Sequence, residues 1–275
     1  MTGRDKLAAA FLAADPDGAA RLLETLPSDD AATLVAPCEP HAAARLFARM
    51  LPGYTARCIE RLEPAQVAEI VERMDSQDAI AVLRQLAPAA RARLLAALRP
   101  QWSAAFELLL RYPPSAVGAW AEPFALTLPA DCTIAEARER IERNERTARA
   151  RIYVLDRARR VRGAVRGLAL LRHAGSVRLS AVLEPASPLW ARETVADALE
   201  RELWERDPEA PVVTRDHEFL GAVSYADLRR ALRRQSRAEP SAGPRQGLTE
   251  LAELLATGAG GLWESFGELV QPRSR

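Results

Sequence analysis

Prolines recur every twelve residues through the first half of the chain, and this spacing constrains the fold more than any other feature. The series consists of Pro40, Pro52, Pro64, Pro88 and Pro100, with Ser76 at the one remaining position. Proline is favoured in the first turn of a helix, where its missing N–H group is not needed. Ten residues after each position stands a leucine or methionine. The pattern predicts a row of short helices, each opened by proline and closed by an apolar residue.

A second apolar column follows the same period. It consists of Leu46, Cys58, Ile70, Val82, Leu94 and Phe106. A helix of about 8–10 residues is marginal alone in water and depends on packing against its neighbours. The units therefore predict a superhelical α-solenoid over residues 1–112. A solenoid of this kind is typical of a docking or sensing surface.

The periodicity changes after Tyr112-Pro113-Pro114. Strand patterns at 124–128, 152–155 and 161–165 alternate with helical patterns at 134–147 and 167–172. The same order returns with strands at 188–190, 211–214 and 219–224 and helices at 195–206 and 225–234. Two consecutive β-α-β-β-α units over residues 113–235 are indicated. The predicted class is α+β multidomain, an all-α solenoid followed by a tandem pair.

The C-terminal 40 residues divide into a linker and a tail. Residues 236–247 are polar and rich in Pro and Gly, which predicts a linker. Residues 248–275 carry an apolar helical stripe beside an acidic face. A helix lying on a membrane favours a basic face, so we expect segment 248–270 to bind a protein partner. No stretch approaches the ~20 apolar residues of a spanning helix, which predicts a cytoplasmic protein without a transmembrane segment.

The charged residues and the cysteines and histidines exclude several classes of function. The chain has 38 basic and 37 acidic residues, three separate cysteines and three separate histidines. This spacing argues against a disulfide framework and a zinc site, and no catalytic constellation is apparent, so no enzyme is predicted. Arg138–Arg166 contains eleven arginines against four acidic residues. Phosphate binding is one interpretation; a solvated hairpin with Arg–Glu pairs is the other, and scarce aromatics argue against nucleic acid.

Several motifs resemble one family in both sequence and order. These are Leu26–Ala31, Met74–Ile80, Leu110–Pro113 and Gly221–Leu228. Over residues 20–235 the chain resembles the cytosolic part of the MgtE family of magnesium transporters, a superhelical N domain followed by a tandem CBS pair. The family continues into a membrane pore, which this sequence does not show. In the first unit, Arg166 and Leu170 stand at the positions of the family's ribose-contacting Ser/Thr and Asp.

The resemblance implies a magnesium site. Acidic side chains at the family's domain interfaces bind Mg²⁺, and the matching residues here are Asp75, Asp78, Asp29 and Asp30. Facing carboxylates repel unless a cation lies between them, so ion occupancy biases a domain equilibrium. The alternative is that these residues cap or charge helix N-termini.

The resemblance also implies an adenine nucleotide and a homodimer through the CBS pair. Ser224 and Asp227 match the ribose contact of the second unit; the alternative is a helix-capping pair. The predicted function is a cytosolic regulatory module responsive to magnesium or nucleotide, resembling a transporter's sensor half without its own pore. The alternative is a non-sensing structural adaptor, since the short helices also resemble the scaffold of the flagellar switch protein FliG.

Overall fold

The computed structural model describes residues 11, 12, 14–143 and 151–238. The chain divides into two compact parts, Met1–Leu232 and Arg233–Arg275. The fold described below is that of Met1–Leu232, and "first unit" and "second unit" refer to its two β-α-β-β-α units. The predicted tail at 248–275 lies outside the described residues, as does the linker from 239 onward. Among the described residues, no helix combines the length and apolar character needed to cross a bilayer.

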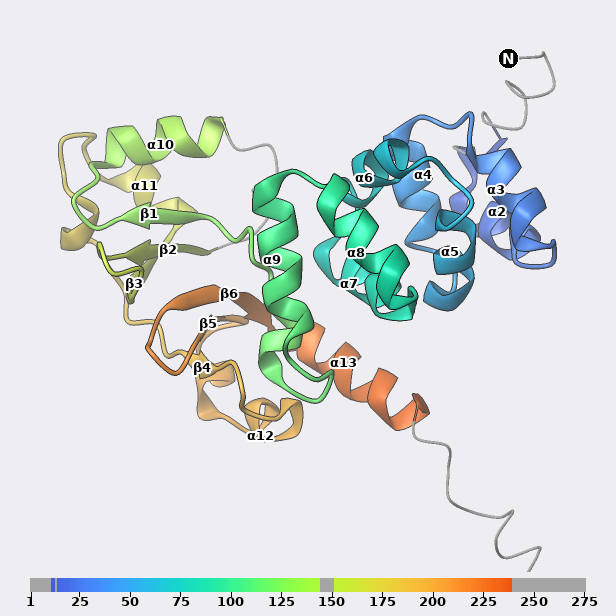
Figure 1. Ribbon diagram of the computed structural model, residues 1–275. Coiled ribbons are helices and arrows are strands. Elements are labelled where there is room, and N and C mark those ends of the chain that lie inside the picture. The colour runs from blue at the N-terminus through green and yellow to red at the C-terminus, as the bar shows by residue number, and fades with distance from the viewer. Residues whose placement is uncertain (1–10, 13, 144–150, 239–275) are drawn as a thin grey trace, which may run out of the picture. The chain divides into compact units, whose positions relative to one another are not determined.

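From residue 16 onward, the described part of the first half of Met1–Leu232 contains eight short helices (Figure 1). They are α2 (Pro16–Leu23), α3 (Ser28–Val35), α4 (Pro40–Phe47), α5 (Pro52–Ile59), α6 (Pro64–Val71), α7 (Ser76–Gln85), α8 (Pro88–Ala97) and α9 (Pro100–Leu110). Every proline of the twelve-residue series lies in the first turn of its helix. The solenoid of proline-opened helices is confirmed.

The backbone N–H groups at the starts of the helices find hydrogen-bond acceptors in two ways. In α7, where serine replaces proline, the Asp75 side chain accepts a hydrogen bond from the Gln77 N–H at 3.0 Å. At two proline-opened helices, a glutamate from an earlier helix binds the backbone N–H just before the proline. Glu24 accepts from Leu51 at 2.5 Å and Glu72 from Arg99 at 2.9 Å. These carboxylates satisfy N–H groups that a helix start leaves without an intrahelical partner.

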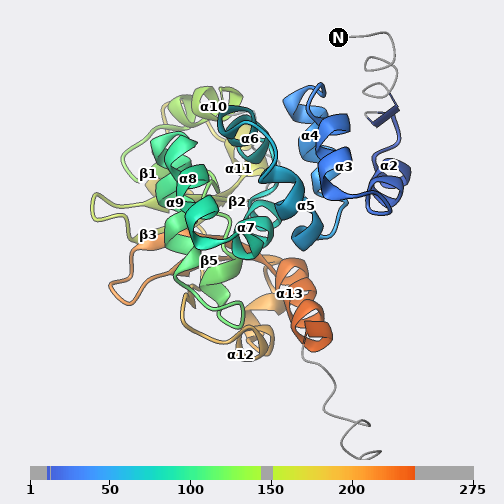
Figure 2. The ribbon, with the colours of Figure 1, turned by 45° about the vertical axis from the view of Figure 1, so that its right-hand side comes forward.

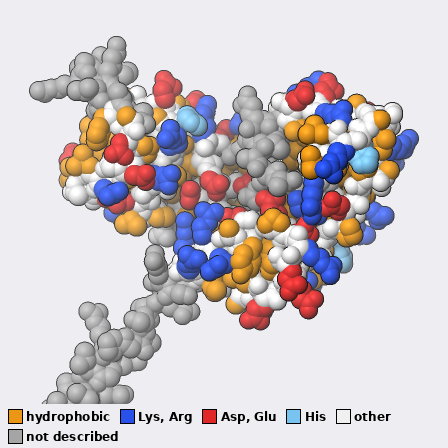
Figure 3. All heavy atoms as spheres, turned by 180° about the vertical axis from the view of Figure 1, so that it is seen from behind, with side chains coloured by type: hydrophobic (Ala, Val, Ile, Leu, Met, Phe, Trp, Pro, Cys, Tyr) orange, Lys and Arg blue, Asp and Glu red, His pale blue; other side chains and the backbone are white. Residues whose placement is uncertain are grey.

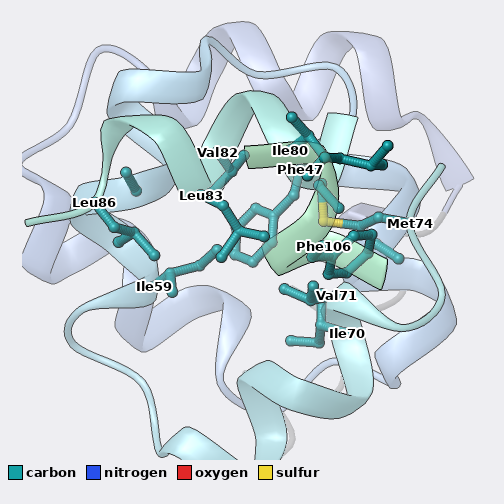
Figure 4. Close-up of a cluster of buried hydrophobic side chains, with 14 of the residues drawn as sticks. Phe47, Ile59, Ile70, Val71, Met74, Ile80, Val82, Leu83, Leu86 and Phe106 are labelled. Atoms are coloured by element: carbon teal, nitrogen blue, oxygen red, sulfur yellow. The ribbon is translucent and has the colours of Figure 1, made fainter. Parts of the chain in front are cut away.

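Each of the helices α2 to α7 packs against the next helix but one. The result is two rows, α2–α4–α6–α8 and α3–α5–α7–α9, whose helices can be followed in Figure 2. The predicted apolar column lies between the rows, and all six of its members are buried. Figure 4 shows Phe47, Ile70, Val82 and Phe106 meeting there with Leu83. Stacking thus gives each short helix the apolar contacts that it lacks alone.

The second half contains two three-stranded sheets with their helices. The first unit comprises β1 (Thr127–Pro129), α10 (Ile134–Glu142), β2 (Arg151–Leu155), β3 (Val161–Arg166) and α11 (Gly167–Arg172). The second comprises β4 (Leu189–Trp190), α12 (Val195–Leu199), β5 (Glu209–Val213), β6 (Phe219–Ser224) and α13 (Tyr225–Ala238). Single-turn 3₁₀ helices lie at Val117–Trp120, Leu179–Ala181 and Glu202–Glu205.

The two units share one topology. In each, the first strand pairs parallel with the second, which pairs antiparallel with the third, and each antiparallel pair has an irregularity before its last residue. Alternate residues of β2 face opposite sides. Ile152 and Val154 pack with α10 and α11, whereas Tyr153 packs with Phe219 and Ala222 of the second unit. The predicted α+β class with tandem β-α-β-β-α units is confirmed.

Three predicted elements differ from the structure. The helix expected at 195–206 ends at Leu199, because the Trp204 indole N–H donates to the Ala198 carbonyl at 2.6 Å. The strand expected at 124–128 begins at Thr127, because the Phe124 N–H donates to the Glu122 carboxylate and its ring packs on Trp102. Helix α10 ends at Glu142, and residues 144–147 of the expected helix lie outside the described part.

The buried column predicts a matched pair of stability effects. Leu46 is fully buried in α4, while Leu51 is 66% exposed. Leu46→Ala should lower the free energy of unfolding by about 2–5 kcal/mol, because it leaves a cavity between the rows. Leu51→Ala should change it by less than about 0.5 kcal/mol. Urea denaturation followed by circular dichroism compares the two, and equal effects would contradict the assigned packing.

Candidate functional site

Ser224 and Asp227 lie where β6 ends and α13 begins. The Ser224 hydroxyl donates to the Asp227 carboxylate at 2.6 Å, and the Asp227 N–H donates back to Ser224 Oγ at 3.1 Å. This is the reciprocal arrangement of a helix cap, the alternative considered for the pair. The Asp227 side chain is only 12% exposed and forms an ion pair with Arg230. The two residues predicted to bind ribose are therefore brought together and held in place.

Arg230 connects this pair electrostatically with acidic residues of the solenoid. The hydrogen bond to Asp227 raises the pKa of Arg230 most, and the negative charges of Asp227, Asp75 and Asp78 raise it further. The carboxylates of α7 therefore act on the same guanidinium as Asp227. This places two of the four predicted metal ligands in the electrostatic environment of the predicted nucleotide pair.

The four predicted metal ligands form two pairs on different helices. Asp75 caps α7 and Asp78 lies in its first turn, one turn further along. Asp29 and Asp30 lie in the first turn of α3, where exposed Asp29 pairs with Arg61 at 2.8 Å. Within the described ranges, no three His, Cys, Asp or Glu side chains are grouped to hold a metal. A cation at either pair would have two carboxylates and complete its coordination with water, as Mg²⁺ commonly does.

Glu122 joins the solenoid to the second unit. The buried Ser76 hydroxyl donates to its carboxylate at 3.0 Å, and the Gln77 amide donates to the adjacent Ala121 carbonyl at 3.2 Å. The Glu122 backbone exchanges two hydrogen bonds with Ala222 of β6, at 2.7 and 3.1 Å. Two residues after Ala222, β6 ends at Ser224. A continuous path of hydrogen bonds and strand therefore runs from α7 to the Ser224–Asp227 pair.

Gly221 permits this contact. A Cβ atom at Gly221 would lie 2.5 Å from the Glu122 carbonyl oxygen, a distance that real Cβ atoms do not show. The sequence analysis named neither Glu122 nor Arg230. A glycine inside a strand often marks close approach of another backbone, so Gly221 was the available signal for Glu122. For Arg230 no comparable signal exists, because its acidic neighbours on α7 are distant in sequence.

The first unit differs at the equivalent positions. Arg166 ends β3 as Ser224 ends β6, so the residue equivalent to Asp227 is Ala169. The sequence-based choice of Leu170 is wrong by one position, and Leu170 is instead buried among the helices of its unit. Arginine and alanine thus replace the Ser–Asp pair. Arg166 is held by Glu184 at 3.0 Å.

A buried ion pair lies beside Arg166. Arg151, only 4% exposed, pairs with Asp207 of the second unit at 2.7 Å. Other arginines of the basic stretch Arg138–Arg166 also bind partners within the protein. Arg143 pairs with Glu139 one helical turn away, and Arg138 donates to the carbonyls of Leu170 and His173. Its residues 144–150 lie outside the described part. The Arg143–Glu139 pair has the four-residue spacing expected for the ion-paired interpretation, whereas Arg151 is buried and not solvated.

The solenoid matches a known family. Residues 14–115 match the family model of the MgtE intracellular N domain. The solenoid is therefore similar to the MgtE intracellular N domain, and this part of the chain is called the MgtE N domain below. Among curated proteins, the comparison found no match to this sequence. The sequence-based resemblance to the MgtE family is confirmed for this domain.

Solved structures extend the similarity beyond the MgtE N domain. The chain is similar to the cytosolic domain of the Mg²⁺ channel MgtE in complex with ATP, with a TM-score of 0.69 and 20% identity over 78% of this chain and 89% of that one. It is also similar to the soluble part of a magnesium transporter, with a TM-score of 0.58 and 15% identity over 84% of this chain and 99% of that one. At these identities the similarity shows the fold, which is that of an MgtE N domain followed by a CBS pair.

The contact between Glu122 and β6 predicts a specific glycine effect. Gly221→Ala should lower the free energy of unfolding by about 1–3 kcal/mol, because the added methyl meets the Glu122 backbone. Gly167→Ala is the matched control, since a Cβ there meets nothing within 4 Å, and should change stability by less than about 1 kcal/mol. Chemical denaturation measures both. A neutral Gly221→Ala would show that Glu122 does not approach β6 closely.

Proposed function

We propose that this chain is a cytoplasmic regulatory module for magnesium transport, in which ligand binding at the CBS pair is coupled to ligand binding at the MgtE N domain. The observation that carries the proposal is the path from Ser76 through Glu122 and Ala222 to Ser224. A ligand that alters the end of β6 acts, through this path, on the helix that carries Asp75 and Asp78. The similar fold of a magnesium channel's cytosolic domain supports this assignment.

The second CBS unit is the proposed nucleotide site. The Asp227 carboxylate would accept hydrogen bonds from ribose hydroxyls, and Ser224 Oγ would exchange its present partner for the ligand. Helix α13 has 14 residues, and the N–H groups of its first turn suit an anion. The relative in complex with ATP supports an adenine nucleotide as the ligand class. We propose one such site per chain, because Arg166 and Ala169 replace the pair in the first unit.

Asp75 and Asp78 form the proposed magnesium-responsive site. Carboxylate oxygens suit Mg²⁺, and the two side chains lie one turn apart on α7. Asp29 is already paired with Arg61, which favours the α7 pair. Mg²⁺ at these carboxylates would compete with their attraction for Arg230. Ion binding would therefore change the electrostatic balance between the MgtE N domain and α13.

Two further predictions and one alternative accompany the proposal. The assignment as a regulator includes no catalytic activity. The homodimer stays a prediction, for which Leu168 and Leu171 of α11 provide exposed apolar side chains, 56% and 74% exposed. The alternative, a non-sensing adaptor, has no specific contact in its favour. Response to a ligand separates the adaptor from the regulator.

The nucleotide proposal is tested by calorimetry with ATP. The wild-type chain should bind saturably, and Asp227→Asn should weaken binding by about tenfold or more, because a charge-assisted hydrogen bond is worth about 1.5–3 kcal/mol. Asp216→Asn, in the exposed turn between β5 and β6, is the control and should bind as wild type. Thermal unfolding of each variant checks that α13 remains folded. Undiminished affinity in Asp227→Asn would reject the site.

The magnesium proposal is tested by limited proteolysis across millimolar Mg²⁺. The wild-type cleavage pattern should depend on the ion, and Asp75→Asn/Asp78→Asn should remove that dependence because it removes both charges. Asp29→Asn/Asp30→Asn is the matched control and should respond as wild type. Loss of response only in the α3 variant would move the site to α3. No response in the wild type would reject magnesium sensing and leave the nucleotide test unaffected.

A further inference from the structure

A hollow of about 620 Å³ lies at the C-terminal end of the MgtE N domain. Side chains from three helices and the segment after α9 line it. The charged members are Arg84 from α7, Arg91 from α8, Glu107 from α9, and Arg111 directly after α9. Leu95 and Leu110 contribute apolar surface. The volume lies within the range of about 300–1,000 Å³ typical of small-molecule sites.

The charge of this hollow is unbalanced. Within the described ranges, Arg84, Arg91 and Arg111 have no ion-pair partner, whereas other solenoid arginines such as Arg61 and Arg99 do. Glu107 is the one acidic residue in the lining, and it accepts a hydrogen bond from Ser103 at 3.4 Å. Burial and, secondly, the charge of Arg91 lower the pKa of Arg84. Arg84 and Arg91 therefore repel each other, and a bound anion would relieve that repulsion.

Arg84 is held in position by the backbone. Its Nη2 donates to the Tyr112 carbonyl at 2.8 Å and to the Leu109 carbonyl at 3.4 Å. A guanidinium has five N–H donors in a planar fork that matches phosphate oxygens. With Nη2 anchored, the other nitrogens of Arg84 are oriented without the full entropic cost of fixing a free side chain. The hollow thus combines one preorganised arginine with two adaptable ones.

We propose that this hollow binds a small phosphorylated ligand, with its phosphate groups on Arg84, Arg91 and Arg111 and its apolar part against Leu95 and Leu110. The site is separate from the proposed nucleotide pair, because its lining comes from the MgtE N domain and the segment that follows it. It does not rest on the proposed function.

Ligand binding here would act on the connection to the CBS pair. Arg84 holds the carbonyl of Tyr112, whose ring lies so close to Gly118 that a Cβ there would be 2.8 Å away. The Gly118 N–H in turn donates to Ala191 of the second CBS unit at 2.8 Å. A phosphate that engages Arg84 would therefore act, through the Tyr112 carbonyl, on the segment by which the solenoid enters the CBS pair.

Calorimetry with pyrophosphate in low-salt buffer tests the site on the full chain. The wild type should bind saturably, and Arg91→Glu/Arg111→Glu should weaken binding by about tenfold or more. Arg21→Glu/Arg45→Glu makes the same change in net charge at exposed solenoid positions outside the hollow and should bind within about twofold of wild type. Ser224→Ala/Asp227→Asn should also bind as wild type, which separates this site from the CBS pair. Circular dichroism confirms the fold of each variant.

Binding results of three kinds would overturn the proposal. No saturable binding by the wild type, or equal loss in both arginine double variants, leaves only a general charge effect. Loss confined to Ser224→Ala/Asp227→Asn assigns the phosphate to the CBS pair. Saturable binding of an acidic peptide without binding of pyrophosphate makes the hollow a protein-docking surface. Failure of the ATP test at Asp227 with pyrophosphate binding retained rejects the proposed nucleotide site and leaves this one intact.

Discussion

The carboxylate of Glu122 secures the solenoid to the second CBS unit. It accepts hydrogen bonds from the Ser76 hydroxyl and the Phe124 N–H, while its backbone pairs with Ala222. Ser76 is fully buried, and a buried hydroxyl without a partner costs about 1–3 kcal/mol. Ser76 also occupies the single position of the twelve-residue series without proline. The interruption of the series and the attachment of the two halves are therefore the same feature.

The two CBS units share one backbone fold but carry side chains of different charge at equivalent positions. Both have the same strand order, register irregularity and helix starts, yet their equivalent strand ends differ in charge. Arg151 and Arg166 occupy the first unit where Glu209 and Ser224 occupy the second. In the first unit, ion pairs with Asp207 and Glu184 hold these arginines. In the second, the Ser224–Asp227 pair lies beside a cation, Arg230, that also interacts with the solenoid. Loss of the ribose-type pair on one side accompanies a gain of cross-unit ion pairing.

Local rules predicted most elements of the fold. The proline series predicted the solenoid helices, and the helix starts expected at residues 134 and 195 agree with α10 and α12. There the side chains of Thr133 and Thr194 each accept a hydrogen bond from an N–H of the first turn. The break in the helix after Leu199 was not predictable, because it depends on where the Trp204 indole N–H finds a carbonyl. The site was predictable only in part. Ser224 and Asp227 are three residues apart in sequence, whereas Arg84, Arg91 and Arg111 come to one hollow only when three helices stack.

The alternation of solenoid helices between two rows limits how this domain can change in length. Each helix packs on the next but one, so consecutive twelve-residue units belong to opposite rows. Deleting one unit would move every later helix into the other row and would turn the buried face of α7, with Ser76, away from Glu122. Deleting or inserting two units keeps every later helix in its row. The natural step of insertion or deletion in this architecture is therefore a pair of helices, even though the sequence repeats with every single one.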